Sequence, residues 1–254
     1  MFVDTHTHIS DDAFRGEEEA VIARAQAKGV GIMLQADICR AERSAMYELC
    51  ARHPGVLYPM IGLHAEEVRE DWRDEIDSLQ DWLPQHPVAV GEIGIDYHWD
   101  VTFKEQQKEV LRIQFELADK WDLPVNIHLR DATEDFFKVL DDCRHLGLRG
   151  NLHAFSGSIE TFRRIRRYGD WSVGIGGVIT FKKAALPETV RQIPLECILL
   201  ETDSPYMAPT PLRGTRNESA NIPLIAAKVA EVKGVDIETV AAVTTANAEK
   251  LFAL

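Results

Sequence analysis

The sequence is poor in cysteine and has no long hydrophobic run. Its four cysteines, Cys39, Cys50, Cys143 and Cys197, are scattered and form no C-x-x-C pair, so no disulfide framework is indicated. No apolar stretch reaches membrane-spanning length, and the first residues lack the basic and apolar segments of a secretory signal. We therefore expect a soluble, cytoplasmic protein with no membrane partner.

Basic residues are also scarce. The chain has 28 Lys and Arg against 41 Asp and Glu, a formal net charge of −13. This balance argues against a broad electrostatic surface for duplex DNA or for an anionic membrane. It does not exclude a substrate that carries phosphate, because bound divalent cations would dominate the local field of a site. No sequence feature indicates an obligate protein partner.

Short apolar runs alternate with longer amphipathic ones through all 254 residues, and no Pro/Gly/Ser-rich linker interrupts them. The expected strands are FVDTH near Phe2, GIMLQA near Ile32, LYPMIGLH near Met60, VAVGEIG near Val90, PVNIHLR near Ile127, GNLHAF near Leu152, WSVGIGG near Val173 and CILLETD near Leu199. The expected helices are Glu17–Lys28, Ala41–Arg52, Trp72–Trp82, Phe103–Trp121, Thr133–Leu146, Ile159–Tyr168, Ala185–Gln192, Asn221–Lys233 and Ile237–Phe252. Within the fourth helix, Val110, Ile113, Leu117 and Trp121 share one face, which predicts that they point to the core.

Alternating strands and helices imply parallel strands, and eight repeats favour a closed barrel. A (β/α)8 barrel typically needs about 250 residues. The sequence therefore predicts a single domain, residues 1–254, with a TIM-like (β/α)8 barrel fold of the α/β class.

Ionisable residues recur where the expected strands end. They are His6, His8, His64, Glu92, His128, His153 and Asp203. In a parallel barrel the carboxyl ends of the strands share one face, and that face carries the active site. These residues are thus expected to lie close together.

Their residue types point to a metal site. The imidazoles of His6 and His8, two residues apart on a strand, project to the same side. Glu92, His128 and His153 lie inside apolar strings, where an unpaired ionisable group carries a large desolvation cost. Each could instead be a hydrogen-bonded structural residue, and Asp203 could cap a helix, but the whole set favours metal ligands. Imidazoles with carboxylates suit Zn²⁺, Mn²⁺ or a mixed set, and Mg²⁺ less well.

The ordered motifs VDTHTH, IGLHA, VGEIGIDYH, NIHLRDA, HAFSG, GVITFKK, ETDSPY and LRGTRNE resemble the TatD family of metal-dependent deoxyribonucleases, among the amidohydrolase-type barrels. The resemblance runs from Val3 to about Glu218 and implies two adjacent divalent cations as cofactors, Mg²⁺, Mn²⁺ or Zn²⁺. Carried over by position, it implies that one cation is held by His6, His8 and Asp203, the other by His128 and His153, and that Glu92 bridges them.

The resemblance also suggests residues around the metals. His64 matches a position near the substrate, and we assign it phosphate contact or proton transfer. Basic side chains after strands five, seven and eight could reach a phosphodiester, although each could equally be a solvated surface charge; they are Arg130, Lys182, Arg213 and Arg216. Asp96, Tyr97 and Asp4 could orient the ligands through hydrogen bonds. The chain departs from the family pattern after His153, after His64 and at Ser219.

The expected activity is hydrolysis of a phosphodiester by a cation-activated water, with Asp203, Glu92 and His64 in catalytic roles. The family resemblance implies DNA as the substrate, degraded from a single-stranded end in the 3′ to 5′ direction. A metal-dependent ester or amide hydrolase, such as an aminoacyl-RNA deacylase, is the enzymatic alternative. A catalytically silent binding barrel is the other alternative, and the complete ligand set argues against it.

Overall fold

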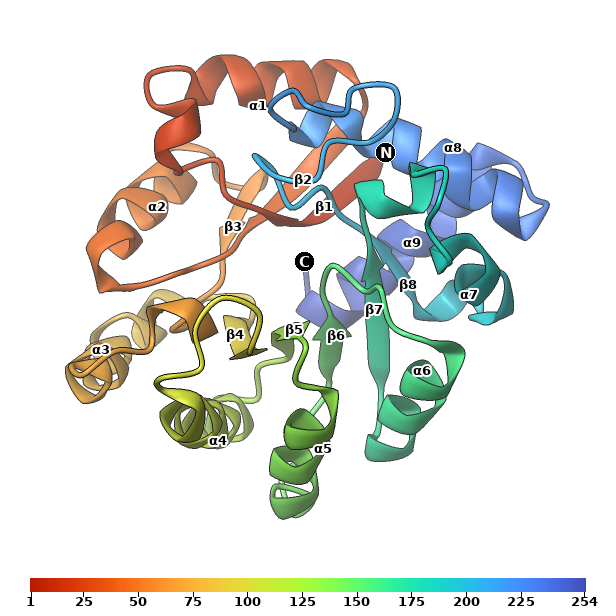
Figure 1. The fold of residues 1–254 in the computed structure, drawn as a ribbon. Coiled ribbons are helices and arrows are strands. Elements are labelled where there is room, and N and C mark those ends of the chain that lie inside the picture. The colour runs from red at the N-terminus through yellow and green to blue at the C-terminus, as the bar shows by residue number, and fades with distance from the viewer.

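Strand and helix alternate along the whole chain in the computed structural model, which describes residues 1–254 (Figure 1). The strands are β1 (Phe2–Thr7), β2 (Val30–Gln35), β3 (Leu57–Pro59), β4 (Val90–Asp96), β5 (Val125–Arg130), β6 (Gly150–Leu152), β7 (Trp171–Ile175) and β8 (Ile198–Leu200). The helices are α1 (Glu18–Ala27), α2 (Arg40–Arg52), α3 (Trp72–Ser78), α4 (Lys104–Lys120), α5 (Thr133–Asp142), α6 (Ile159–Ile165), α7 (Leu186–Gln192), α8 (Ile222–Lys233) and α9 (Ile237–Phe252).

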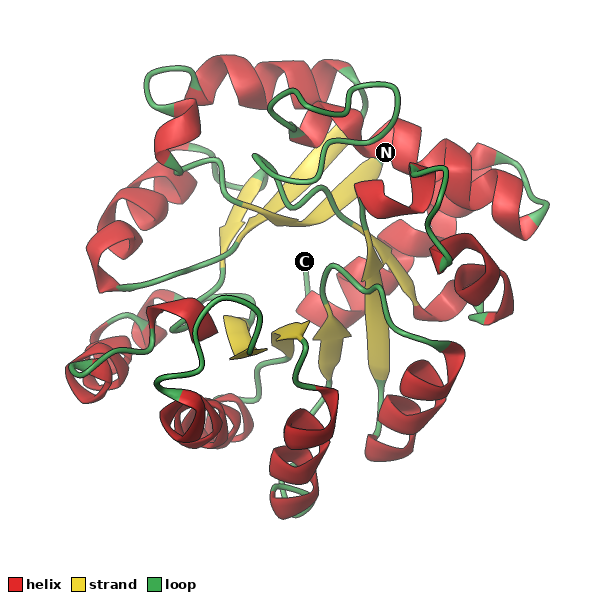
Figure 2. Ribbon diagram, viewed as in Figure 1, coloured by secondary structure: helices red, strands yellow, loops and turns green.

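All paired strands run parallel and follow sequence order. One sheet is β1-β2-β3 and the other is β4-β5-β6-β7-β8. Single bridges join the two sheets at both seams, Ile61 with Val90 and Thr7 with Ser204. The strands therefore surround a common centre, and the helices lie outside them (Figure 2). In this ring β4 and β8 stand on opposite sides.

The last helix covers one end of the barrel. α9 contacts both β1 and β8, and its final residues Ala248, Leu251 and Phe252 pack against Val3 and Leu199 in one buried apolar cluster. In Figure 1, α9 passes behind the strands and the C-terminus lies near the barrel centre. The interior can therefore be approached only from the opposite end, where the strands finish.

Local signals account for several helix boundaries. The side chains of Ser158 and Asp236 accept hydrogen bonds from backbone N–H groups in the first turns of α6 and α9. α8 ends at Gly234, whose φ of 69° lies in the left-handed region that glycine adopts without strain. None of the helices is both long enough and apolar enough to cross a bilayer.

The fold class and the position of each strand and helix confirm the prediction, and the differences are local. α5 ends at Asp142 instead of Leu146, and Cys143 caps it. α3 ends at Ser78 and continues as a 3-10 turn. Trp121 does not face the core: it caps the end of α4 and is 38% exposed. Val110 and Leu117 of the same expected face are buried.

A buried ion pair joins Arg43 of α2 to Asp37, which lies in the loop after β2. The Arg43 guanidinium is 0% exposed and donates through Nε to Oδ2 of Asp37 at 2.6 Å. Asp37 in turn exchanges backbone hydrogen bonds with Gly91 and Glu92, of 3.2 and 3.0 Å. Arg43 also donates to the carbonyl of Gly62 and to Ser78. The pair thus fixes the backbone that carries Glu92.

Replacing Asp37 with Ala should lower the free energy of unfolding by about 3–5 kcal/mol, because it leaves the Arg43 charge buried without a partner. Chemical denaturation monitored by circular dichroism measures the change. The matched control is Arg15→Ala, which breaks an ion pair with Asp12 whose side chains are 77% and 79% exposed, and which should unfold like the parent protein. Equal stability of Asp37→Ala and the control would contradict this role of the pair.

Candidate metal centre

The six expected ligands converge at the end of the barrel where the strands finish. His6 and Glu92 lie on β1 and β4, and His128 lies on β5. His8 and His153 immediately follow β1 and β6, and Asp203 lies three residues beyond β8. Since each element contributes one or two side chains, closure of the barrel is what brings the set together.

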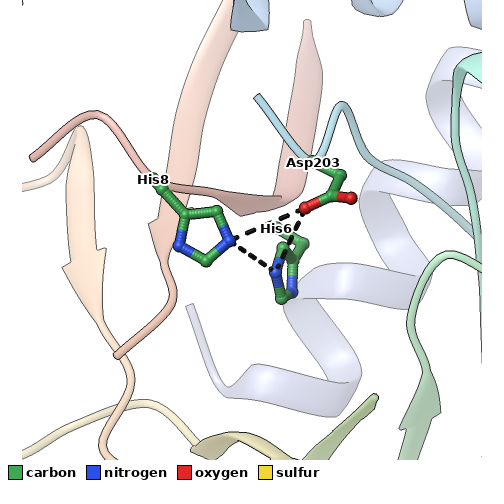
Figure 3. A group of neighbouring side chains, drawn as sticks. All are labelled: His6, His8 and Asp203. Atoms are coloured by element: carbon green, nitrogen blue, oxygen red, sulfur yellow. Dashed lines mark hydrogen bonds and ion pairs between the residues drawn. The ribbon is translucent and has the colours of Figure 1, made fainter. Parts of the chain in front are cut away.

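One cluster lies at the seam between β1 and β8 (Figure 3). Nε2 of His6 is 3.1 Å from Nε2 of His8, and Oδ1 of Asp203 is 3.8 and 3.6 Å from these two nitrogens. Nδ1 of His6 lies 2.9 Å from Oδ1 of Asn126 and donates its proton there, which leaves an electron pair on Nε2. Imidazole and carboxylate electron pairs thus converge on one point, an arrangement that fits a cation.

The backbone of Asp203 directs its carboxylate into this cluster. Its φ of 56° lies in the left-handed region, which aspartate tolerates better than most residues. The N–H of Asp203 donates to the carbonyl of His6 at 2.9 Å, so the loop after β8 is fastened directly to β1. The side chain of Asp203 is 18% exposed, against 4% for that of Glu92.

The Glu92 carboxylate lies between this cluster and a second one. Its Oε2 is 3.1 Å from Nε2 of His6 and 3.6 Å from Nε2 of His8. Its Oε1 is 3.0 Å from Nδ1 of His128 and 2.9 Å from Nε2 of His153. The two oxygens therefore face different pairs of imidazoles, which is the geometry that a bridging ligand requires.

Residues outside the ligand set orient the second pair of imidazoles. Nε2 of His128 donates to Oδ2 of Asp96 at 2.7 Å, so loss of the second ring proton leaves an electron pair on Nδ1, which faces Glu92. Nδ1 of His153 is 3.4 Å from Oε1 of Glu201, an ion-pair distance without hydrogen-bond geometry. Glu201 is fully buried, and a Cβ at position 174 would collide with its carboxylate, so Gly174 makes room for it.

His64 lies beside Glu92 but differs from the ligands in its tautomer. Its Nδ1 accepts a hydrogen bond from the backbone N–H of Glu66 at 3.2 Å. The proton of the neutral ring therefore resides on Nε2, which points at Oε1 of Glu92 from 3.2 Å. His64 thus presents a donor to the centre in this tautomer, and its contact with a substrate stays a prediction.

A further cluster of possible ligands, Glu66, Asp96 and His128, adjoins the centre. His128 already directs Nδ1 toward Glu92 and donates from Nε2 to Asp96. Binding a cation through Nε2 as well would require a doubly deprotonated imidazole. We therefore assign Asp96 to orientation of His128 and assign no cation to this cluster.

The charge states of the carboxylates favour cation binding at neutral pH. Burial would raise the pKa of Glu92, but the imidazoles of His153, His64 and His6 outweigh it and hold that pKa well below its usual range. Burial would also raise the pKa of Asp203, but its hydrogen bond with His8 opposes this, and the pKa lies below its usual value. Burial would lower the pKa of His128, yet its hydrogen bonds to Asp96 and Glu92 raise it to about 9. A cation must therefore displace a proton from His128.

The four basic residues expected near a substrate differ in whether a carboxylate pairs with their charge. Arg216 is held by ion pairs with Glu17 and Glu218 and by a hydrogen bond to the carbonyl of Ala13. Arg213 is exposed and stacks over the ring of Phe181, 3.9 Å from its centroid. Lys182 is exposed, and Arg130 is partly buried; neither forms an ion pair. Their contact with a substrate stays a prediction.

Several supporting residues were predicted incompletely from the sequence. Asp96 accepts a hydrogen bond from His128, an expected ligand, whereas Tyr97 donates to Asp135. Asp4 accepts hydrogen bonds from Thr202 and from the backbone N–H of His6, so it contacts the backbone of an expected ligand and not its ring. Asn126 and Glu201 were missed. Both are polar residues in apolar strand strings, the same signal that identified Glu92, and it could have identified them.

Comparison with known proteins agrees with this architecture. A model of the family described as TatD-related DNase matches residues 3–253. The uncharacterized metal-dependent hydrolase YabD of Bacillus subtilis is 36% identical over 99% of each chain. The putative deoxyribonuclease tatdn3 of Danio rerio is 30% identical, covering 99% of this chain and 97% of its own. The crystal structure of YjjV, a TatD homologue of Escherichia coli, matches with a TM-score of 0.91 at 30% identity, covering 100% of this chain and 98% of that one.

Replacing Asp96 with Asn should weaken metal binding about 10- to 100-fold, because the His128 ring loses the carboxylate that orients it. Isothermal titration of the metal-free protein with Zn²⁺ or Mn²⁺ measures the loss. The matched control is Glu66→Gln in the neighbouring cluster, which should bind like the parent. Loss of metal in the control as well would show that the Glu66 cluster holds a cation and would overturn the assignment of Asp96.

Proposed function

Because this chain belongs to the TatD-related DNase family of metal-dependent hydrolases, we propose that residues 1–254 form one hydrolase domain that cleaves phosphodiester bonds of DNA with two divalent cations. The observation that carries the proposal is the position of Glu92. One carboxylate oxygen faces His6 and His8, and the other faces His128 and His153. A single tetrahedral ion would not need six ligands distributed in this way.

Cations at these two places would supply Lewis-acid activation of water and stabilisation of charge on the phosphoryl oxygens. The chain supplies the remaining groups. Oδ1 of Asp203 faces the histidines, while its Oδ2 makes no protein hydrogen bond and can accept the proton of the attacking water. Nε2–H of His64 can donate to an oxygen of the substrate. Asp203 thus acts as the proton acceptor, and His64 acts as a hydrogen-bond donor.

The shape and charge of the protein support a single strand end as the substrate. α9 covers the far end of the barrel, so a substrate enters among the loops that follow the strands. A flexible strand can reach a centre recessed among loops, whereas a stiff duplex cannot. Arg130, Lys182 and Arg213 have no carboxylate partners; Arg130 ends β5, and the other two lie in the segments that follow β7 and β8. We propose that they contact phosphates and that digestion proceeds 3′ to 5′.

The cation stoichiometry is testable through the bridge. The parent protein should take up close to two divalent cations per chain, and Glu92→Ala should lower the occupancy of both, because each histidine pair loses one facing oxygen. Elemental analysis after equilibrium dialysis measures both values. His8→Ala serves as the comparison, since it removes a ligand of one place only and should spare the other. One saturable cation in the fully active parent protein would refute the binuclear proposal.

The substrate is testable with end-labelled DNA. With Mg²⁺ or Mn²⁺, the protein should release mononucleotides from linear single-stranded DNA, more slowly from blunt duplex, and leave circular single strands intact. Asp203→Asn, which retains a side chain of similar size, should reduce the rate at least 100-fold. Rapid cutting of the circle would exclude a strict exonuclease. Cleavage of an aminoacyl-RNA ester with no cleavage of DNA would replace the nuclease proposal by the deacylase alternative.

A further inference from the structure

Among the Phe, Tyr and Trp side chains only two are more than half exposed, and both lie in loops that follow strands of the barrel. Trp99 is 69% exposed and Tyr206 is 55% exposed. Trp99 follows β4 and Tyr206 follows β8, so the two rings stand on opposite sides of the open end of the barrel. Large aromatic side chains usually bury most of their surface, and an exposed ring beside a binding site is a typical recognition element.

The loop that carries Trp99 is fastened to the metal centre. Oδ1 of Asp96 accepts the backbone N–H of His98 at 2.7 Å, while Oδ2 of the same carboxylate holds His128. The His98 ring is paired with Asp131 at 3.0 Å and meets the Trp99 ring edge to face, with centroids 4.8 Å apart. The position of Trp99 is thus set by the residue that orients a ligand.

A guanidinium lies on this ring. Arg130, which ends β5, lies with Cζ 5.2 Å from the centroid of the Trp99 ring. Arg130 has no carboxylate partner, in contrast to Arg216, which is paired with Glu17 and Glu218. An indole face and an unpaired guanidinium therefore adjoin at the edge of the centre. The exposed carboxylate that follows Arg130 in the chain, Asp131, is paired with His98.

We propose that Trp99 and Arg130 form a stacking subsite for an unpaired nucleobase next to the phosphodiester at the metal centre. The proposal rests on the proposed nuclease function and specifies how the strand is held. Single-stranded nucleic acid is bound where bases stack on aromatic rings and backbone phosphates meet cations, and a duplex offers no free base face. Tyr206 is less suited to hold a nucleotide. Its hydroxyl donates to the Asp11 carboxylate at 3.3 Å, and this negative charge repels phosphate.

The test compares substrates with and without a base. For a single-stranded oligo-dT, Trp99→Ala should raise KM about 5- to 100-fold with kcat nearly unchanged, and Trp99→Phe should restore most of the loss. For an abasic oligonucleotide of the same length, which offers no aromatic face, all three proteins should behave alike. Trp121→Ala, which removes a 38% exposed ring at the end of α4, is the matched control and should resemble the parent.

An unchanged KM for oligo-dT in Trp99→Ala would overturn the subsite, as would an equal loss on both substrates. If the parent protein cleaves no DNA, the nuclease proposal fails and binding decides on the subsite. Oligo-dT should then quench part of the tryptophan fluorescence of the metal-loaded parent, and neither Trp99→Phe nor an abasic oligonucleotide should give this quenching. Quenching that survives in Trp99→Phe, or no quenching in the parent, would refute the subsite.

Discussion

The Glu92 carboxylate inside a group of imidazoles is the constraint on which the rest of the structure depends. It is 3% exposed, and its oxygens lie 2.9 to 3.6 Å from ring nitrogens of five histidines. An anion at this depth is costly unless cations or protons compensate it. The backbone at Glu92 is held in turn by Asp37, whose own charge is paired with Arg43. The position of Glu92 is therefore set by Asp37 and Arg43, which lie behind it.

Orientation of the imidazoles depends on groups outside the expected ligand set. Asn126 fixes the tautomer of His6, Asp96 that of His128, and the backbone of Glu66 that of His64. The first two leave an electron pair facing Glu92, and the third leaves a proton there. Chemically identical rings thus receive different roles through the hydrogen bond made by the nitrogen that faces away from the centre.

The sequence predicted the barrel, because the alternation of strands and helices is a local pattern. It also predicted that the six expected ligands lie close together, because parallel topology brings the carboxyl ends of strands to one face, and their side chains do converge. Glu92, however, lies two residues into β4 instead of at its end. Contacts between distant elements could not be predicted in this way. Arg43 lies in an ordinary amphipathic helix pattern, and only the tertiary structure brings it to Gly62 and Ser78. Arg216 matched a substrate position in sequence, yet two neighbouring carboxylates hold its guanidinium.

The acidic surface limits how a polyanion can be held. With a net charge of −13, the outer surface repels nucleic acid, so attraction is confined to the open end of the barrel. Arg130 and Arg213 each lie over an aromatic ring there, which keeps their charge near the centre without a carboxylate to neutralise it. Under the proposed nuclease function, few phosphates would be contacted at once, so affinity would depend on local contacts to the terminal nucleotides. Such a site would select strand ends by what can reach the cations and stack beside them.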